Sequence, residues 1–176
     1  MSRAGGVPRI LFAGYAPVHF VCFRPIYERL RRRRDVELVL SGGREADPLT
    51  GVPALSAREL YAPFRIPSAR IVTLGQMGRQ RFDLVLSAHV SGYFPRQDRV
   101  RAQLFHGVSF RNMAVRRDVL VYDRLLLVGP YMRRLFTDQQ LLREEDPRLV
   151  DIGFPKLDRL VDGSLSRRAI LNRLGF

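Results

Sequence analysis

Short apolar runs alternate with helix-like stretches through most of the chain, and this alternation constrains its fold more than any other feature. The runs that we expect to form strands are residues 9–14, 36–40, 82–87, 101–105, 124–128 and 149–152. Between them, apolar residues recur at helical spacing, as in residues 19–34, or a Gly-Pro pair opens a helix, as at Gly129. Strands that alternate with helices form a parallel sheet with helices on both faces. We therefore predict an α/β, Rossmann-like fold.

Prolines complicate two parts of this pattern. Pro25 lies within the first helical stretch, and we expect it to mark the true first turn, where proline is tolerated. Residues 45–68 contain four prolines, so we expect a loop there with a short strand near Val52–Leu55 and a short helix near Ala57–Tyr61. Residues 71–75 fit either a strand or part of a helix.

The end of the sequence reads as two further helices. The Gly-Phe-Pro turn at residues 153–155 opens a helix that we expect to continue through Val161. The second helix, residues 165–174, has Ser164 or Ser166 as a candidate N-terminal cap. We assign residues 1–163 to one Rossmann-like domain. We expect residues 164–176 to form a terminal helix that leads to a C-terminal domain absent from this sequence.

The chain is strongly basic, which favours partners that carry phosphate. It has 30 lysines and arginines against 17 acidic residues, and Lys156 is the only lysine. The planar fork of arginine binds phosphate through two hydrogen bonds, so nucleic acid, an anionic membrane surface and a phosphorylated substrate are all candidates. The same charge can also come from arginines that are simply exposed to solvent and bind no partner. This interpretation fits the run Arg31–Arg34 best.

Other aspects of composition narrow the class of protein. The sequence is 46% hydrophobic, which supports a folded core. It has no apolar run approaching the roughly 18 residues of a membrane span. The single cysteine, Cys22, excludes an internal disulfide and a cysteine-cluster metal site. We expect no cofactor and a cytoplasmic location, with association at the inner face of the cell membrane as an open alternative.

The three histidines of the chain each follow a predicted strand. His19 comes shortly after the first strand, His89 after the strand at residues 82–87, and His106 directly after the next one. The carboxyl ends of parallel strands lie on one edge of a sheet, where ligands bind in α/β proteins. Histidine is the usual general base near neutral pH. The pattern predicts a cleft there, although each histidine also has a structural reading as a buried or loop-bonded side chain.

Two segments are candidate ligand-binding sites, and the segment after His106 has more of the features that such a site needs. Gly107 allows close approach of a ligand, Ser109 is placed to cap a following helix whose free N–H groups favour phosphate, and Arg111 adds charge. The second candidate is Lys156. It stands in the first turn of a helix, against the helix dipole, which indicates a nearby anion or a carboxylate partner.

Several segments of the sequence, taken in order, carry a family resemblance. They are Ala16-Pro17-Val18-His19-Phe20 with Arg24-Pro25-Ile26-Tyr27, His106-Gly107, Tyr122-Asp123-Arg124-Leu125 before Gly129-Pro130-Tyr131, and Gly153-Phe154-Pro155-Lys156-Leu157-Asp158-Arg159-Leu160. Together they resemble the N-terminal half of the CDP-glycerol glycerophosphotransferase family, whose members build teichoic-acid-type cell-wall polymers and have the two-domain GT-B fold. Val108-Ser109-Phe110 stands where the family more often has Thr-Pro-Leu.

The resemblance implies a function for this chain as the acceptor-side half of a transferase. Its partners would be a CDP-activated alcohol, held mainly by the C-terminal domain, and a polymer or lipid-linked acceptor. His106 matches the family histidine that acts as general base, and His19 is the rival base in the first β–α loop. His89 and Lys156 join Gly107, Ser109 and Arg111 as candidate substrate-binding residues. By itself the chain would be inactive.

Two other functions stay open. A sugar-nucleotide glycosyltransferase or UDP-sugar 2-epimerase of the same fold would favour carboxylates at the strand ends, where Asp98 and Asp118 are the nearest. A basic nucleic-acid-binding module would favour exposed aromatics among the cations, but most phenylalanines here lie in apolar runs. A dinucleotide-binding domain is disfavoured, because Gly14-Tyr15-Ala16-Pro17 is not a G-x-G-x-x-G loop.

Overall fold

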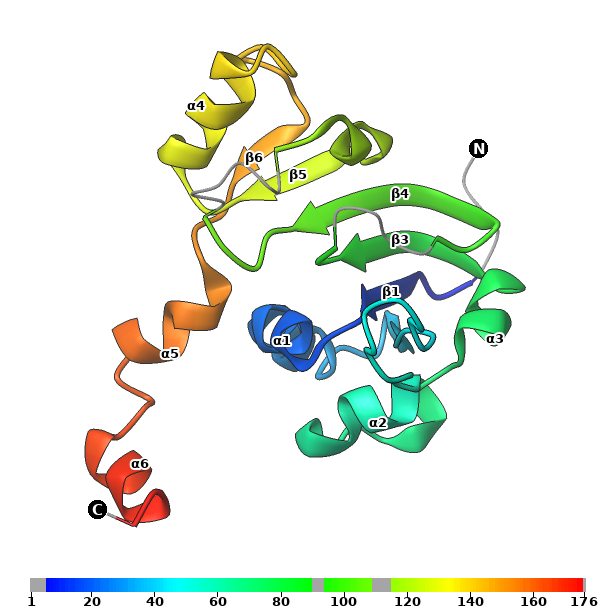
Figure 1. The fold of residues 1–176 in the computed structure, drawn as a ribbon, viewed down its shortest axis with the longest axis vertical. Coiled ribbons are helices and arrows are strands. Elements are labelled where there is room, and N and C mark those ends of the chain that lie inside the picture. Colours follow the sequence, from blue (N-terminus) through cyan, green and yellow to red (C-terminus); the bar gives the residue numbers. More distant parts are fainter. Residues whose placement is uncertain (1–5, 90–93, 109–114, 176) are drawn as a thin grey trace.

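The computed structural model describes residues 6–89, 94–108 and 115–175, which contain a six-stranded parallel sheet (Figure 1). The strands are β1 (Arg9–Gly14), β2 (Glu37–Gly42), β3 (Arg81–Ser87), β4 (Gln97–Leu104), β5 (Arg124–Leu127) and β6 (Leu149–Asp151). Their order in the sheet is β2-β1-β3-β4-β5-β6, and every neighbouring pair is parallel. The predicted α/β class and its parallel sheet are confirmed.

The helices lie mostly where the sequence predicted them. They are α1 (Pro17–Leu30), α2 (Ala57–Tyr61), α3 (Leu74–Gly78), α4 (Pro130–Asp138), α5 (Asp158–Val161) and α6 (Arg167–Arg173), with short 3-10 turns η1 (Ala62–Phe64), η2 (Ser68–Arg70), η3 (Arg117–Val121) and η4 (Pro155–Leu157). Ser166 is the cap of α6, where it accepts the Ala169 N–H. The helix predicted for residues 153–161 is divided between η4 and α5.

Two local predictions were wrong. The strand expected near Val52–Leu55 is only a pair of isolated bridges, Asp47 to Val52 and Arg44 to Leu55, within a loop. Pro25 does not mark a first turn, because α1 begins eight residues earlier at Pro17 and contains Pro25 in its interior. An interior proline loses one helix hydrogen bond. Phe20 and Phe23 before Pro25 and Tyr27 after it are all buried against the sheet, which favours a continuous helix.

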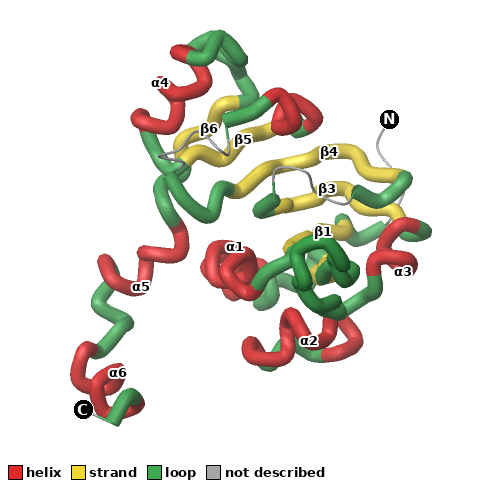
Figure 2. The backbone as a smooth tube through the Cα atoms, in the orientation of Figure 1, coloured by secondary structure: helices red, strands yellow, loops and turns green. Residues whose placement is uncertain are grey.

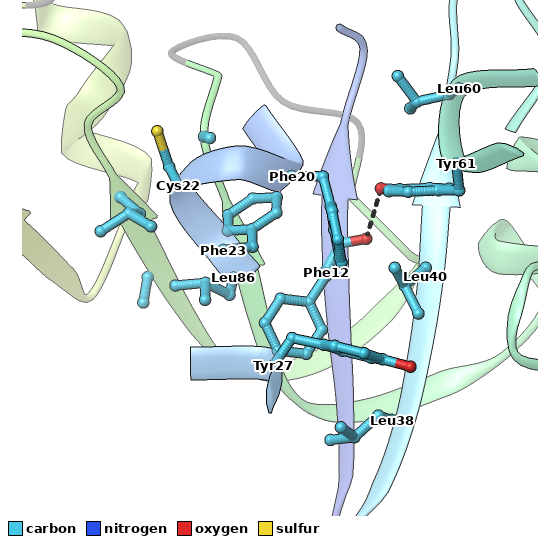
Figure 3. Close-up of a cluster of buried hydrophobic side chains, with 13 residues drawn as sticks. Phe12, Phe20, Cys22, Phe23, Tyr27, Leu38, Leu40, Leu60, Tyr61 and Leu86 are labelled. Carbon is cyan, nitrogen blue, oxygen red and sulfur yellow. Dashed lines mark hydrogen bonds between the residues drawn. The ribbon is translucent and has the colours of Figure 1, made fainter. Parts of the chain in front are cut away.

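Helices cover both faces of the sheet, with side chains of alternate strand residues packing against each layer. On one face, Phe20, Phe23 and Tyr27 of α1 pack with Phe12 of β1 and with residues of α2 (Figure 3). The opposite face carries α3 and α4. Met77 of α3 packs on Leu11, Val39 and Val85, and Met132 and Phe136 of α4 pack on Leu125, Leu127 and Leu149.

The strand order places a topological switch point between β1 and β3. The chain moves from β1 to β2 on one side and returns to β3 on the other. In open α/β sheets, the carboxyl ends of the strands at such a switch point are the usual place for a ligand. Figure 2 shows β3 and β4 as neighbouring strands in yellow, with α1 in red beside them. In the described part of the chain, no helix has the length and apolar character that a membrane crossing needs.

Candidate functional site

The three histidines lie together beside the switch point. The ring centroid of His19 is 4.9 Å from that of His106 and 6.4 Å from that of His89. Tyr15 lies between two of them, with ring centroids 4.4 Å from His19 and 4.2 Å from His89. His19 is in the first turn of α1, and His89 and His106 each follow a strand end by two residues. The arrangement brings together residues that lie up to 87 positions apart because parallel strands share one carboxyl edge.

His19 is buried and is held in one tautomer. Its Nδ1 accepts the main-chain N–H of Tyr15 at 3.1 Å, so in the neutral ring the proton is on Nε2. The side chain is 1% exposed, and Nε2 has no hydrogen-bond partner among the described residues. Burial, followed by the charges of His106 and His89, lowers the pKa of His19 to about 3. Near neutral pH, His19 is therefore an uncharged ring that offers a donor at Nε2.

Glycines at the strand ends make this packing feasible. A Cβ on Gly14 would lie 2.9 Å from the Cβ of His19, closer than real side chains approach. Gly42 has φ +142°, and a Cβ there would lie 1.6 Å from the carbonyl oxygen of Gly14. These two positions let the ends of β1, β2 and α1 approach one another. The sequence pattern indicated neither role: Gly14 ends a predicted strand, and Gly42 lies two residues beyond the end predicted for the next one.

His106 has the opposite hydrogen-bond arrangement. Its Nδ1 lies 3.1 Å from the carbonyl oxygen of Ala88, and a carbonyl can only accept, so Nδ1 carries the proton. The Nε2 atom of the neutral ring then keeps its lone pair. The residue is exposed, which leaves the ring accessible to a substrate. His106 is the histidine of the cluster whose tautomer is fixed for accepting a proton at Nε2.

Lys156 comes to the same loop from the far end of the chain. Its Nζ donates to the carbonyl oxygen of His106 at 3.1 Å and lies 4.4 Å from the centroid of the Phe154 ring. The two segments that the sequence singled out, around His106 and around Lys156, are thus in direct contact. The predicted carboxylate partner Asp158 has no ion pair with Lys156 in the described structure.

His89 is half-buried and is positioned through its main chain. Its N–H donates to the Oγ of Ser87 at 3.2 Å, and its carbonyl accepts a hydrogen bond from the hydroxyl of Tyr122 at 2.5 Å. Tyr122 therefore ties the loop after β3 to the segment before β5. Sequence reasoning quoted Tyr122 in a motif but gave it no role.

Gln103 is a further residue that sequence reasoning missed. It lies near the end of β4, in register with Ser87 of β3, and is 1% exposed. Its Oε1 has no hydrogen-bond partner among the described residues. A polar residue inside the apolar run before His106 was the signal that could have identified it.

The remaining predicted site residues divide into two groups. Gly107 is described, and a Cβ at that position would meet nothing within 4 Å, so the protein itself does not need a glycine there. Ser109 and Arg111 lie outside the described residues. Within the described ranges, no group of three or more histidine, cysteine or acidic side chains is arranged to hold a metal ion.

The site can therefore offer a proton acceptor at His106 and a cation at Lys156 on one edge of the sheet, with the neutral ring of His19 buried beside His106. The catalytic and binding roles of these residues stay predictions. Comparison of the chain with protein-family models, with curated proteins and with solved structures finds no match.

Proposed function

We propose that this chain is the acceptor-side domain of a transferase that moves a phospho-alcohol from a CDP-activated donor to an acceptor hydroxyl. The resemblance to CDP-glycerol glycerophosphotransferases suggests the donor, and a second, nucleotide-binding domain would complete a GT-B arrangement. The observation that carries the proposal is the hydrogen bond from His106 Nδ1 to the Ala88 carbonyl, which leaves Nε2 as a proton acceptor at the sheet edge.

In this reaction, Nε2 of His106 takes the proton of the acceptor hydroxyl as its oxygen attacks the β-phosphorus of the donor. The bond between that phosphorus and the oxygen bridging to CMP breaks, and CMP leaves with the electron pair. Phosphoryl transfer of this kind depends on positioning and on neutralising charge more than on covalent help. The ammonium group of Lys156, next to the His106 carbonyl, would contribute part of that charge.

The rival base, His19, fits the acceptor role less well. Its Nδ1 already accepts the Tyr15 N–H, and its proton is on Nε2. A base with the low pKa given by burial would also be a weak one, since an efficient general base has a pKa near the working pH. We therefore assign His19 to positioning of the loop at Tyr15, and proton transfer to His106.

The test uses the intact protein and measures CMP release from CDP-glycerol in the presence of an acceptor. His106→Asn keeps an N–H that can donate to the Ala88 carbonyl but removes the basic nitrogen, so kcat should fall by about 100-fold or more. His19→Asn keeps an acceptor for the Tyr15 N–H and should retain most of the turnover. Thermal unfolding of both variants checks that they are folded.

Two results would contradict the proposal. Loss of turnover in His19→Asn with turnover retained in His106→Asn would show that the base is wrongly assigned. Release of a nucleotide from another activated donor, with none from CDP-glycerol, would exclude the donor class.

A further inference from the structure

A basic groove lies between α1 and the turn formed by η4 and α5. It has a volume of about 550 Å³, which is within the roughly 300–1,000 Å³ of small-molecule sites. One wall is formed by Val21, Arg24, Pro25, Glu28, Arg29 and Arg32. The other wall is formed by residues between Pro155 and Leu165, where Lys156 and Arg159 lie with the carboxylates Asp158 and Asp162. Over the whole lining, five cations face three carboxylates, so the groove keeps an excess of positive charge.

The α1 wall is a continuous stripe with an excess of positive charge. The members within α1, from Val21 to Arg29, recur three or four residues apart and lie on one side of the helix, and Arg32 lies in the turn just after the helix ends at Leu30. Arg24, Arg29 and Arg32 form no hydrogen bond or ion pair with any residue that the structure describes. The acidic Glu28 is already engaged by Arg31, at 3.2 Å. Cations that converge on a groove without partners are suited to an anionic ligand.

The opposite wall connects the groove to the histidine cluster. Lys156 lines the groove and also donates to the carbonyl of His106. Across the groove, the Arg159 side chain donates to the hydroxyl of Ser164 at 3.4 Å, and its charge helps to lower the pKa of Asp162. The charged stripe therefore begins beside His106 and runs away from it along α1.

We propose that this groove binds a linear ligand that carries two or more phosphate groups. The guanidinium groups are distributed along the stripe rather than gathered at one point, so successive phosphates can each meet a different arginine. Arginine also offers the bidentate geometry that phosphate accepts. If the proposed function holds, this ligand is the acceptor, and the groove leads its end to His106.

The test measures binding of tripolyphosphate and of orthophosphate by isothermal titration calorimetry, without any need for turnover. Wild-type protein should bind tripolyphosphate at least about tenfold more tightly than orthophosphate, since several charge-assisted contacts act together. The triple variant R24A/R29A/R32A should weaken tripolyphosphate binding by about tenfold or more. Arg24 and Arg29 lie within α1, where alanine is a good helix former, and Arg32 lies in the turn after it, so α1 should stay folded, which circular dichroism can check.

The matched control is R79A/R117A/R134A, which removes the same number of charges from exposed arginines that do not line the groove. It should leave tripolyphosphate binding within about twofold of wild type, because screening at physiological salt limits long-range effects. An equal loss in both triple variants would overturn the proposal and indicate binding to net charge alone. Equal affinity for the two phosphates would overturn the claim of a multiphosphate ligand.

Two further outcomes separate this proposal from others. Binding to phosphatidylglycerol vesicles that R24A/R29A/R32A abolishes, with no binding of tripolyphosphate, would contradict it and identify a membrane contact instead. His106→Asn should bind tripolyphosphate as wild type does. If His106→Asn binds tripolyphosphate and also keeps full turnover, the proposed function is wrong and the phosphate-binding groove is supported. If R24A/R29A/R32A binds tripolyphosphate as wild type does, the groove proposal is wrong and the proposed function is unaffected.

Discussion

The ammonium group of Lys156 donates a 3.1 Å hydrogen bond to the main-chain carbonyl of His106, fifty positions earlier in the sequence. This contact joins the loop after β4 to the turn at η4. It places the only lysine of the chain beside the histidine that can accept a proton at Nε2. The segment after β6 is therefore part of the site and not only a connection to α5 and α6.

Removing that contact should slow transfer more than it destabilises the fold. In Lys156→Met, the His106 loop loses its anchor and the site loses a cation, so we expect kcat to fall by about tenfold. A hydrogen bond of a partly exposed group contributes only about 1 kcal/mol, so the free energy of unfolding should change by no more than that. Lys156→Arg keeps a donor and should recover part of the activity. Unchanged kcat in Lys156→Met would show that the contact has no role in turnover.

His19 should make stability fall in acid. The pKa of His19 falls from 6.5 in the unfolded chain to about 3 in the folded protein. Between these two pH values, the side chain is protonated in the unfolded chain but not in the folded protein. The stability contribution is complete above pH 6.5 and is lost as the pH falls towards 3, by at most about 1.4 kcal/mol per pH unit. Urea unfolding between pH 7 and pH 4 measures this loss.

The matched variant for that experiment is His19→Asn, which keeps an acceptor for the Tyr15 N–H but does not titrate. Other groups contribute equally to both proteins, so the difference between the two curves isolates His19. We expect a steeper decline for wild type. Parallel curves would mean that His19 is protonated in the folded protein as readily as in the unfolded chain.

Gly42→Ala should be among the most damaging small substitutions in the sheet. The new Cβ would lie 1.6 Å from the Gly14 carbonyl oxygen, and the φ of +142° is one that residues with a side chain rarely adopt. The free energy of unfolding should fall by about 3 kcal/mol or more. Gly75→Ala is the control: it is in α3 with nothing within 4 Å, and it should be neutral or stabilising by up to about 1 kcal/mol. A loss of similar size in both variants would contradict the close-approach argument.

Tyr61 should stabilise the packing of α2 on the sheet through its hydroxyl. That group donates to the carbonyl oxygen of Ser41 at 2.9 Å, in a buried site. It also lies 3.4 Å from the carbonyl oxygen of Phe12 (Figure 3). Tyr61→Phe should cost about 1 kcal/mol in denaturant unfolding. Burial also raises the pKa of Tyr61, so wild type should lose more stability than the variant as the pH rises above 10. A variant as stable as wild type would contradict this role.

The limits of prediction from the sequence are clear at particular elements. Residues 9–14 form β1 as predicted, because a short apolar run between turns is a local signal. β4 begins at Gln97, four residues before the predicted start, because its exposed polar beginning has no hydrophobic pattern to reveal it. Pro25 was misread because proline indicates a helix start locally, while burial of Phe20 and Phe23 decides that the helix continues through it.

For the candidate site, strand-end positions predicted which edge of the sheet the histidines occupy, and the structure shows how they differ. The tautomers of His19 and His106 depend on the Tyr15 N–H and the Ala88 carbonyl. The sequence pattern does not reveal which main-chain group each histidine bonds. The bond from the Tyr122 hydroxyl to the His89 carbonyl likewise joins segments 33 positions apart, which no local pattern reveals.

The sequence by itself determined the strands, the parallel class of the sheet and the placement of three histidines at strand ends, because these follow from hydrophobic periodicity along the chain. Only the tertiary structure decided the strand order, the fixed proton positions of His19 and His106, and the contact of Lys156 with His106. It alone decided the basic groove along α1 as well. These features depend on close approach between distant segments, where one hydrogen bond or one missing Cβ determines the geometry, and no local pattern encodes that.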